Sequence, residues 1–324
     1  MAVNPIGALE SLLVQAIEMA LVLVAAPLLT GWIRRVKAKI QRRRGASLLQ
    51  PYRDLRRLLG KEVVLADNAS WLFRTAPYLI FGFTWVAASL VPTFATGLLF
   101  SWSADLIAIV ALLGFGRFAL TLAGMDVGTA FGGLGASREA MFATFAEPAM
   151  LTIVFCLALL AGSTQLSNIA EYLVVHDVGL RVTLGMSLIA MVMVALSENG
   201  RVPIDNPATH LELTMVHEAM ILEYSGRHLA LIELAAMQKL LLYISIIGCV
   251  FAPWSLAIGD ATAQARLVGA GLYVVKLCVA GVALGLFETS IAKMRVFRVP
   301  NFLGAALMLG LLGALLLFVS RSLR

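Results

Sequence analysis

The sequence has few of the residues that bind metals or form redox centres. It contains three cysteines and four histidines in 324 residues, and no two cysteines form a CxxC pair. Cys156, Cys249 and Cys278 all fall within apolar segments, so we interpret them as structural thiols. The histidines do not cluster with other metal ligands, and no glycine-rich phosphate loop or activated nucleophile is evident. We therefore expect no cofactor in this chain, and any redox chemistry that involves it is expected on other subunits.

Charged residues are also scarce. They make up 14% of the chain, whereas 60% of the residues are hydrophobic and the mean hydropathy is +0.90. Such a composition leaves too little polar surface for soluble domains. Stretches of about 20 apolar residues, the length that crosses a hydrocarbon core of about 30 Å, recur along the chain. They are too continuous for the alternating pattern of a membrane barrel.

The sequence therefore predicts an all-α membrane protein with one integral domain over residues 1–324. We expect eight transmembrane helices, near residues 8–33, 71–95, 103–124, 140–162, 180–197, 229–258, 267–290 and 301–320. Eleven lysines and arginines lie in the loop 34–70, and the loops on the opposite side carry few. By the positive-inside rule, the loops 34–70 and 198–228 face the cytoplasm and both termini face outward. A nucleic-acid interpretation of the basic cluster is disfavoured because no aromatic platform accompanies it.

Several ionisable residues fall within or at the ends of the predicted helices. A charged side chain at bilayer depth costs about 2.5–3.5 kcal/mol, so such residues normally face the interior of a bundle and often mark ion routes. Glu147 is the sharpest candidate, because Pro148 follows it and frees a backbone carbonyl one turn earlier. For others a structural explanation is equally good. Glu18 could form a structural ion pair, Lys239 could extend to the membrane–water interface, and Asp105, Glu139 and Glu288 near helix ends could be solvated. The full set is Glu18, Asp105, Arg117, Glu139, Glu147, Glu233, Lys239, Lys276 and Glu288.

The loop 197–228 is too polar to span a membrane and too apolar to be a solvated tether. Asn206 as an N-cap with Pro207 at the first helical position predicts a helix that continues to about Leu222. At 100° per residue this helix has two chemical faces, with Glu212 and Glu223 on one and His210 and His217 on the other. A helix that simply lies on the membrane would prefer lysines and arginines on its polar face. The acids and histidines instead indicate a face that receives protons or a polar partner.

Several short motifs follow one another along almost the whole chain. They are Arg43-Arg44-Gly45 with Gln50, Tyr52, Arg53 and Asp54, then Gly60-Lys61, residues 135–139 (GASRE), Glu147-Pro148, then Glu198, Arg201, Pro203 and Asp205, and residues 223–226 (EYSG). Their order resembles the subunit 1 family of respiratory complex I. That family includes the matching membrane subunit of group 4 energy-converting [NiFe] hydrogenases, such as the formate hydrogenlyase and hydrogenase-4 complexes.

The resemblance implies a subunit at the heel of an L-shaped complex in the bacterial cytoplasmic membrane. Its cytoplasmic loops would dock a hydrophilic arm whose large and small subunits carry iron–sulfur clusters and, in the hydrogenase branch, a NiFe centre. Its buried acids would begin a charged axis that continues into antiporter-like membrane subunits. By position, the resemblance assigns proton coupling to Glu147, Glu198, Asp205, Glu212, Glu223 and His210, and docking of the arm to Arg43, Arg44, Arg53, Arg138 and Arg201.

One departure from the family pattern bears on the branch. The acid series that follows the Pro203-Ile204-Asp205 motif is reduced, because Ala208 and His210 replace two of its three acids and only Glu212 remains. A quinone chamber built on that series is therefore in doubt, and we favour a proton-translocating complex of the formate hydrogenlyase or hydrogenase-4 type. The alternatives are the quinone-chamber subunit of an NADH:quinone oxidoreductase and a stand-alone transporter. The transporter is disfavoured because the chain shows no two related halves.

Overall fold

The computed structural model describes residues 5–96, 104–175, 182–205, 215–254, 256–257, 263–292 and 294–322. Within these ranges the chain forms helices and two isolated β-bridges. The helices are α1 (Pro5–Ile40), α2 (Gln50–Leu59), α3 (Trp71–Ser89), α4 (Leu106–Asp126), α5 (Ala130–Ala161), α6 (Leu166–Val175), α7 (Val182–Glu198), α8 (His217–Ile221), α9 (Gly226–Val250), α10 (Ala263–Ser290) and α11 (Val299–Ser322), with a 3₁₀ turn at Val296–Arg298.

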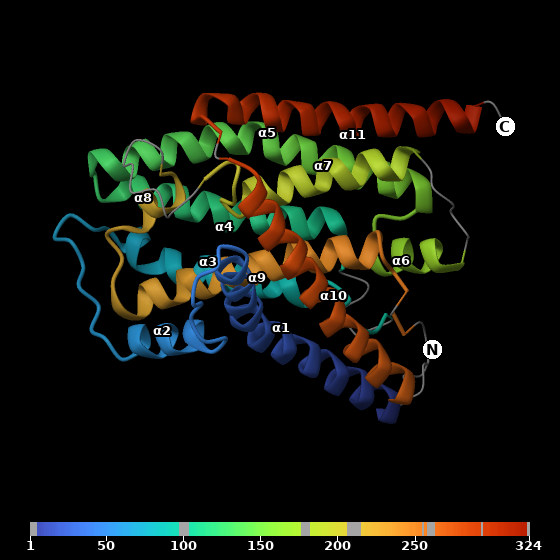
Figure 1. The fold of residues 1–324 in the computed structure, drawn as a ribbon, viewed down its shortest axis with the longest axis horizontal. Helices are drawn as coiled ribbons and strands as arrows, with labels where there is room; N and C mark the ends of the chain where they lie inside the picture. Colours follow the sequence, from blue (N-terminus) through green and yellow to red (C-terminus); the bar gives the residue numbers. More distant parts are fainter. Residues whose placement is uncertain are drawn as a thin grey trace.

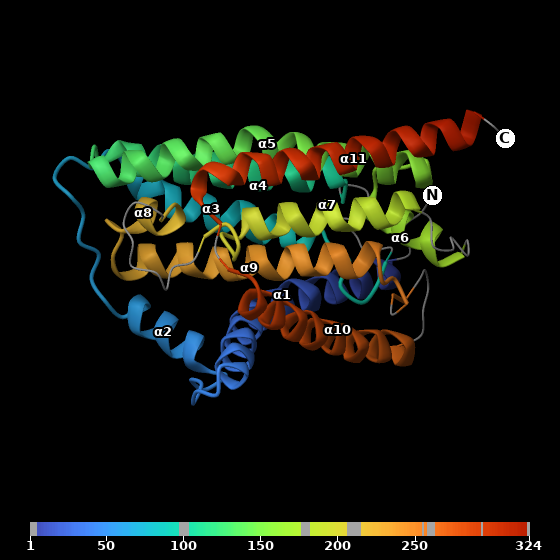
Figure 2. The same cartoon turned by 45° about the horizontal axis from the view of Figure 1, so that its top comes forward.

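Most of the long helices run side by side, namely α3, α4, α5, α7, α9 and α11, and α1 and α10 cross them obliquely (Figure 1). Helix α11 packs against α5 and α7, and α3 packs between α4 and α9. The oblique helices α1 and α10 pack mainly against each other, with α1 also lying against α9. Figure 2 shows the same arrangement turned by 45°, with α2 beside the end of α1. Helix α2 also packs against α9, and its Leu55 is buried in the core of the bundle.

The two ends of the bundle differ. One end carries α2, α8 and the segment between α2 and α3, and we call it the loop end (Figures 1 and 2). Both chain termini lie at the opposite end, which we call the terminal end. We call the half of the bundle next to the loop end the loop half, and the half next to the terminal end the terminal half. That both termini lie at one end agrees with an even number of crossings, whereas the outward orientation of that end stays a prediction.

Among the residues that the structure describes, six helices are long and apolar enough to cross a membrane: α1, α4, α5, α9, α10 and α11. This confirms a helical, multi-pass membrane protein. The other two predicted crossings coincide with α3, which has 19 residues, and α7, which has 17 and is one of the shorter apolar helices. The count of eight crossings therefore remains a prediction.

Local sequence signals explain where several helices begin and end. The side chains of Ser70, Asp105 and Thr129 accept hydrogen bonds from backbone N–H groups of the first turns of α3, α4 and α5. Helix α5 ends at Gly162, whose φ of 74° is the left-handed conformation that glycine adopts freely. Because Thr129 caps it, α5 begins ten residues before the predicted boundary at residue 140.

The predicted helix in the loop 197–228 is only partly described. Residues 206–214 lie outside the described ranges, and the remainder forms the five-residue helix α8 rather than a helix that continues to Leu222. His210 and Glu212 fall in the segment that the structure does not describe. The predicted pairing of acids on one face and histidines on the other therefore stays a prediction.

Candidate functional site

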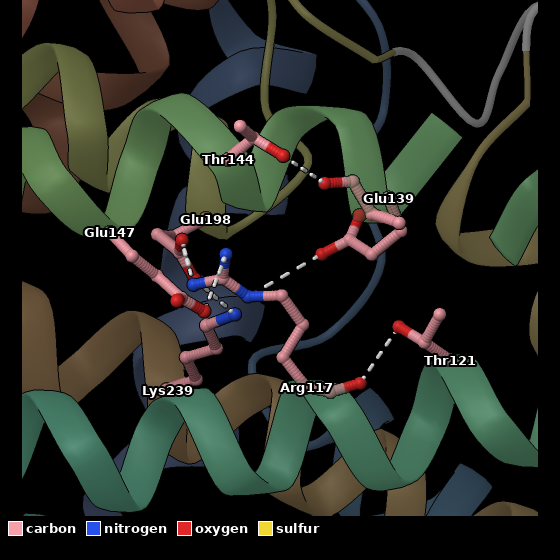
Figure 3. A network of polar contacts seen from close by, with 8 residues as sticks. Arg117, Thr121, Glu139, Thr144, Glu147, Glu198 and Lys239 are labelled. Atoms are coloured by element: carbon pink, nitrogen blue, oxygen red, sulfur yellow. Dashed lines mark hydrogen bonds and ion pairs between the residues drawn. The ribbon is translucent and has the colours of Figure 1, made fainter. Parts of the chain in front are cut away.

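A buried cation, Arg117 of α4, lies at the centre of a cluster of carboxylates in the loop half (Figure 3). Its side chain is only 7% exposed. The guanidinium pairs with Glu198 at the end of α7, and its Nε lies 3.7 Å from Oε1 of Glu139 on α5. Its Nη1 lies 3.6 Å from Oε1 of Glu147, two turns further along α5. One arginine thus connects three carboxylates from two other helices.

Lys239 of α9 supplies the second cation of this cluster. Its Nζ lies 2.8 Å from Oε2 of Glu198, so Glu198 bridges the two cations while its side chain is 3% exposed. With all groups ionised, three carboxylates face two cations. Such an arrangement has one negative charge in excess, so one proton can bind to it without leaving a cation unpaired. We call Arg117, Glu139, Glu147, Glu198 and Lys239 the Arg117 network.

The carboxylates of the network differ in their access to the surroundings. Glu198 is buried and Glu139 is mostly buried, whereas the side chain of Glu147 is 46% exposed on the flank of the chain. Figure 3 shows Glu139 and Glu147 descending from α5 towards the same guanidinium. The network therefore runs from the interior of the bundle to one of its outer faces.

A cavity of about 100 Å³ joins the network to the loop end. Arg117, Glu139, Glu198 and Lys239 line it on one side, and Asp205, His217 and the backbone segment 199–200 belong to its lining nearer the loops. A polar space of this size holds a few water molecules. Burial, together with the positive charge of Lys239, lowers the pKa of His217 to about 4, so this imidazole is neutral at neutral pH.

Two hydrogen bonds hold the segments on either side of residues 206–214 over the cavity. Oδ2 of Asp205, which is buried, accepts a hydrogen bond from the backbone N–H of Val216 at 3.2 Å. Nη1 of Arg138 donates to the carbonyl of Met215 at 3.2 Å. Both residues were predicted from the sequence as site residues. Asp205 lines the cavity, and Arg138 binds the residue next to Val216, which also lines it.

A second ion cluster lies nearby, at the end of α10. Glu288, whose side chain is 1% exposed, pairs with Lys37 of α1 at 2.6 Å and with Arg201 at 3.3 Å. Glu288 is thus buried rather than wet, one of the two possibilities that the sequence left open. Arg201, assigned to docking by resemblance, here connects the segment after α7 with α10.

The remaining predicted residues lie at the loop end. Arg43, Arg44 and Arg53 are exposed, as a docking role requires, and Glu223 is exposed between α8 and α9, away from the network. Sequence reasoning noted Arg117, Glu139 and Lys239 as ionisable residues in helices but did not select them as site residues. One feature of the sequence could have identified them: cations and acids occur in the same half of neighbouring apolar helices.

Residues 223–226 connect the start of α9 with α3 and with the segment between α2 and α3. The ring of Tyr224 stacks on Phe73 at 3.9 Å, and its hydroxyl donates to the carbonyl of Phe73 at 3.0 Å. The hydroxyl of Ser225 accepts from the backbone N–H of Val64 at 2.8 Å and donates to its carbonyl at 3.0 Å. A Cβ on Gly226, whose φ is 53°, would lie 2.5 Å from the carbonyl oxygen of Glu62. This close approach and the positive φ both require glycine at this position.

In the ranges that the structure describes, no three His, Cys, Asp or Glu side chains form a group that could hold a metal ion. The chemistry of the site is therefore that of carboxylates, two cations and a small polar cavity. Such a set can bind and release protons and respond to a change in the local field.

Comparisons with known proteins place this geometry in context. The family model described as NADH dehydrogenase matches residues 13–319. Formate hydrogenlyase subunit 4 of Escherichia coli (strain K12) is 33% identical over 291 residues, which cover 90% of this chain and 94% of the relative. Hydrogenase-4 component C of the same organism is 30% identical over 284 residues, covering 88% and 89%. NADH-quinone oxidoreductase subunit 8 of Rhodothermus marinus is 28% identical over 250 residues, covering 72% of each.

The fold is also found in a solved structure. A chain of the membrane-bound sulfane sulfur reductase, an archaeal respiratory membrane complex, superposes with a TM-score of 0.81 and 18% sequence identity. The match covers 95% of this chain and 99% of that chain. At this level of identity, the likeness concerns the fold.

Proposed function

Because the chain belongs to the NADH dehydrogenase, or complex I subunit 1, family, we propose that it is the membrane-arm subunit of a proton-translocating, hydrogenase-like oxidoreductase complex. The formate hydrogenlyase and hydrogenase-4 type is favoured over an NADH:quinone oxidoreductase. The two relatives of the favoured type match 90% and 88% of the chain, whereas the NADH-quinone oxidoreductase relative matches 72%. The chain anchors a hydrophilic arm and couples its redox chemistry to ion movement.

The Arg117 network is the observation that carries this proposal. It begins at the cavity under the loop end and reaches the flank of the bundle at Glu147. A charged carboxyl that is 46% exposed cannot face hydrocarbon without a cost of about 2.5–3.5 kcal/mol. A polar group of a neighbouring membrane subunit, of the antiporter-like kind that the family resemblance implies, covers Glu147 in the assembled complex and receives its proton.

Coupling to the arm is electrostatic. A redox event in a docked subunit changes the charge above the cavity that Asp205 and His217 border. At an effective dielectric constant of about 20, a unit charge about 10 Å from a carboxylate interacts with it by about 1.7 kcal/mol. This energy changes the proton-binding constant of the carboxylate by about tenfold. The excess carboxylate of the network responds to this field, and the proton moves from the Glu198 side of the network to Glu147.

The exposed basic residues at the loop end provide the surface for the arm. Arg43 and Arg44 follow α1, and Arg53 lies on α2 beside them. Their partners are hydrogenase-like large and small subunits, which carry the iron–sulfur clusters and, where its ligands are kept, the NiFe centre. The basic side faces the cytoplasm of a bacterial cell, in line with the positive-inside rule.

The substitution Glu147→Gln in the intact complex tests the function. It keeps the size and hydrogen-bonding capacity of the side chain but removes its titratable proton, so we expect an assembled complex whose redox turnover continues without proton movement. Proton movement is measured as acidification or alkalinisation of sealed vesicles during turnover. Glu62→Gln, the same change at an exposed position outside the network, is the matched control. An unchanged ratio of protons to turnovers in the Glu147 variant would contradict the proposal.

The subunit composition of the complex tests whether the chain belongs to a hydrogenase-like complex or to an NADH:quinone oxidoreductase. Purification in mild detergent should yield a hydrogenase-like large subunit and an iron–sulfur protein together with this chain. Co-purification of flavin-containing and NADH-binding subunits would instead assign the chain to an NADH:quinone oxidoreductase. Isolation of an active single chain would show that it is a transporter in its own right.

A further inference from the structure

A buried carboxyl outside the Arg117 network remains without an assigned role. Glu18 lies on α1 in the terminal half, packed against the segment 93–95 that follows α3, and the residue is 1% exposed. Its Oε1 accepts hydrogen bonds from the hydroxyl of Thr93 at 3.1 Å and from the backbone N–H of Phe94 at 3.5 Å. Its Oε2 is buried and has no hydrogen-bond partner among the described residues.

No cation compensates Glu18 within the described part of the chain. None of the ion pairs found there includes it. Lys276 of α10, a cation of this half, is bound elsewhere: its Nζ donates to the carbonyls of Gly248 and Ala252 at the end of α9.

The titratable groups within electrostatic range of Glu18 are the thiol of Cys249 on α9 and the phenol of Tyr273 on α10. On α1 itself, Gln15 is buried and donates to the carbonyl of Ser89. A carboxylate that is this deeply buried, without a cation, loses more hydration energy than the hydrogen bonds from the segment 93–95 return. The neutral acid is the form that fits this environment, because it carries no uncompensated charge.

A large groove lies between α7, α9 and α10, next to this carboxyl. It has a volume of about 750 Å³, and its lining is mostly apolar. Thr93, which bonds Glu18, forms part of that lining, as do Tyr243, Ser245 and Tyr273. The hydroxyls of Ser245 and Tyr273 lie 2.7 Å apart, and Tyr243 is within electrostatic range of Arg117 and Glu198. The groove thus carries hydroxyl groups both next to Glu18 and next to the Arg117 network.

We propose that Glu18 is a second proton-binding site of this chain, which exchanges its proton with water in the groove through Thr93. In the exchange, the Glu18 O–H bond breaks as its proton passes to the Thr93 oxygen, and the hydroxyl proton of Thr93 passes to a water oxygen in the groove. The resulting carboxylate accepts hydrogen bonds from Thr93 and Phe94, and the reverse step restores the acid. The place of this site in transport rests on the function proposed above, whereas its occupation by a proton does not.

Infrared difference spectroscopy of the purified complex, between acid and alkaline pH, tests the occupation. The C=O stretch of a protonated carboxyl should appear in the spectrum, should be lost in Glu18→Gln, and should change frequency in Thr93→Val, which removes the hydrogen bond to Oε1. The matched control is Glu171→Gln, because Glu171 also lies in the terminal half and also accepts a hydrogen bond from a threonine, Thr96, at 2.8 Å. Its substitution should leave that band in place.

Three results would overturn the inference: no band that depends on Glu18 at any pH, a band that Glu171→Gln removes instead, or a band abolished by sodium ions at constant pH. The last would mean that a metal cation occupies the carboxylate. If Glu18→Gln does not assemble, Glu18→Asp and Thr93→Val decide the question. Glu18→Asp keeps the carboxyl group and Thr93→Val keeps the volume of the side chain, and each should shift the frequency of the band.

Proton movement in sealed vesicles then separates this inference from the proposed function. Loss of proton movement in both Glu147→Gln and Glu18→Gln supports both proposals. Loss in the Glu147 variant alone, with no band from Glu18, overturns the second site and leaves the function standing. Normal proton movement in both variants, with the band present, overturns the function and leaves Glu18 as a proton-binding group.

Discussion

In the loop half, buried carboxylates meet cations from other helices, whereas in the terminal half they meet hydroxyls and peptide groups. Arg117 and Lys239 hold three acids, and Glu288 holds two cations. In the terminal half, Glu18 accepts from Thr93 and Lys276 donates to backbone carbonyls. The first arrangement keeps its charges apart from the one excess carboxylate of the Arg117 network, since cations compensate the others. The second favours the neutral form of Glu18 and leaves Lys276 as a cap on the end of α9.

The largest expected effect is the removal of the central cation. Arg117→Met leaves Glu139, Glu147 and Glu198 with Lys239 as the one remaining cation of the network, so carboxylates become buried and unpaired. We expect a loss of about 3–5 kcal/mol in the free energy of unfolding, or proton uptake that offsets part of it, and no coupled proton movement. The measurements are the thermal midpoint of the detergent-solubilised complex and proton movement in vesicles. Arg117→Lys should restore part of the stability, and a midpoint equal to the wild type in Arg117→Met would refute the compensation argument.

A smaller effect is expected for Lys276, a half-buried cation of the terminal half. Lys276→Met removes the hydrogen bonds to the end of α9 but leaves no carboxylate unpaired, and it also removes the cost of a charge in an apolar groove. We expect a loss of about 1–2 kcal/mol, clearly below that of Arg117→Met. Both variants are compared in the same thermal assay. An equal or greater loss at Lys276 would show that this lysine compensates a charge and that the two halves are alike.

The last effect concerns the loop end and appears only when the pH is lowered. The pKa of His217 is about 4 in the folded protein and about 6.5 when unfolded, so the unfolded chain binds more protons between these values and stability falls as the pH drops through this window. Between pH 7.5 and pH 5 we expect His217 to contribute a loss of about 1–2 kcal/mol, with the partial exposure of its side chain taken into account. His217→Gln should flatten this part of the stability profile. A profile that is unchanged by the substitution would mean that His217 titrates normally.

The sequence predicted the helices better than the network. Apolar runs gave the positions of all eight long segments, because hydropathy is a local property. Glu147 was selected for a local reason too, the proline that follows it. Arg117 was not, because its partners lie on α5 and α7, and no spacing within α4 shows which distant acids it will meet. For the same reason the sequence did not decide whether Glu288 is buried or solvated, because its cations come from α1 and from the segment after α7.

The extent of α5 illustrates a different limit. Hydropathy predicts where the hydrocarbon begins, but the helix itself begins at its cap, Thr129, and brings Glu139 into position before the apolar run starts. Residues Gly135–Glu139 thus belong to a helix rather than to a loop, and the acid at their end enters the network from that helix. A prediction based on capping as well as hydropathy would have found this.

The carboxylate of Glu288 has a mechanical consequence. Its two oxygens bind Lys37 of α1 and Arg201 of the segment that leads to Asp205. That segment cannot shift without breaking the pair with Arg201 or pulling the end of α10 along with it. Since α10 forms one wall of the groove and Arg201 belongs to its lining, a displacement beneath a docked partner would widen or narrow that groove.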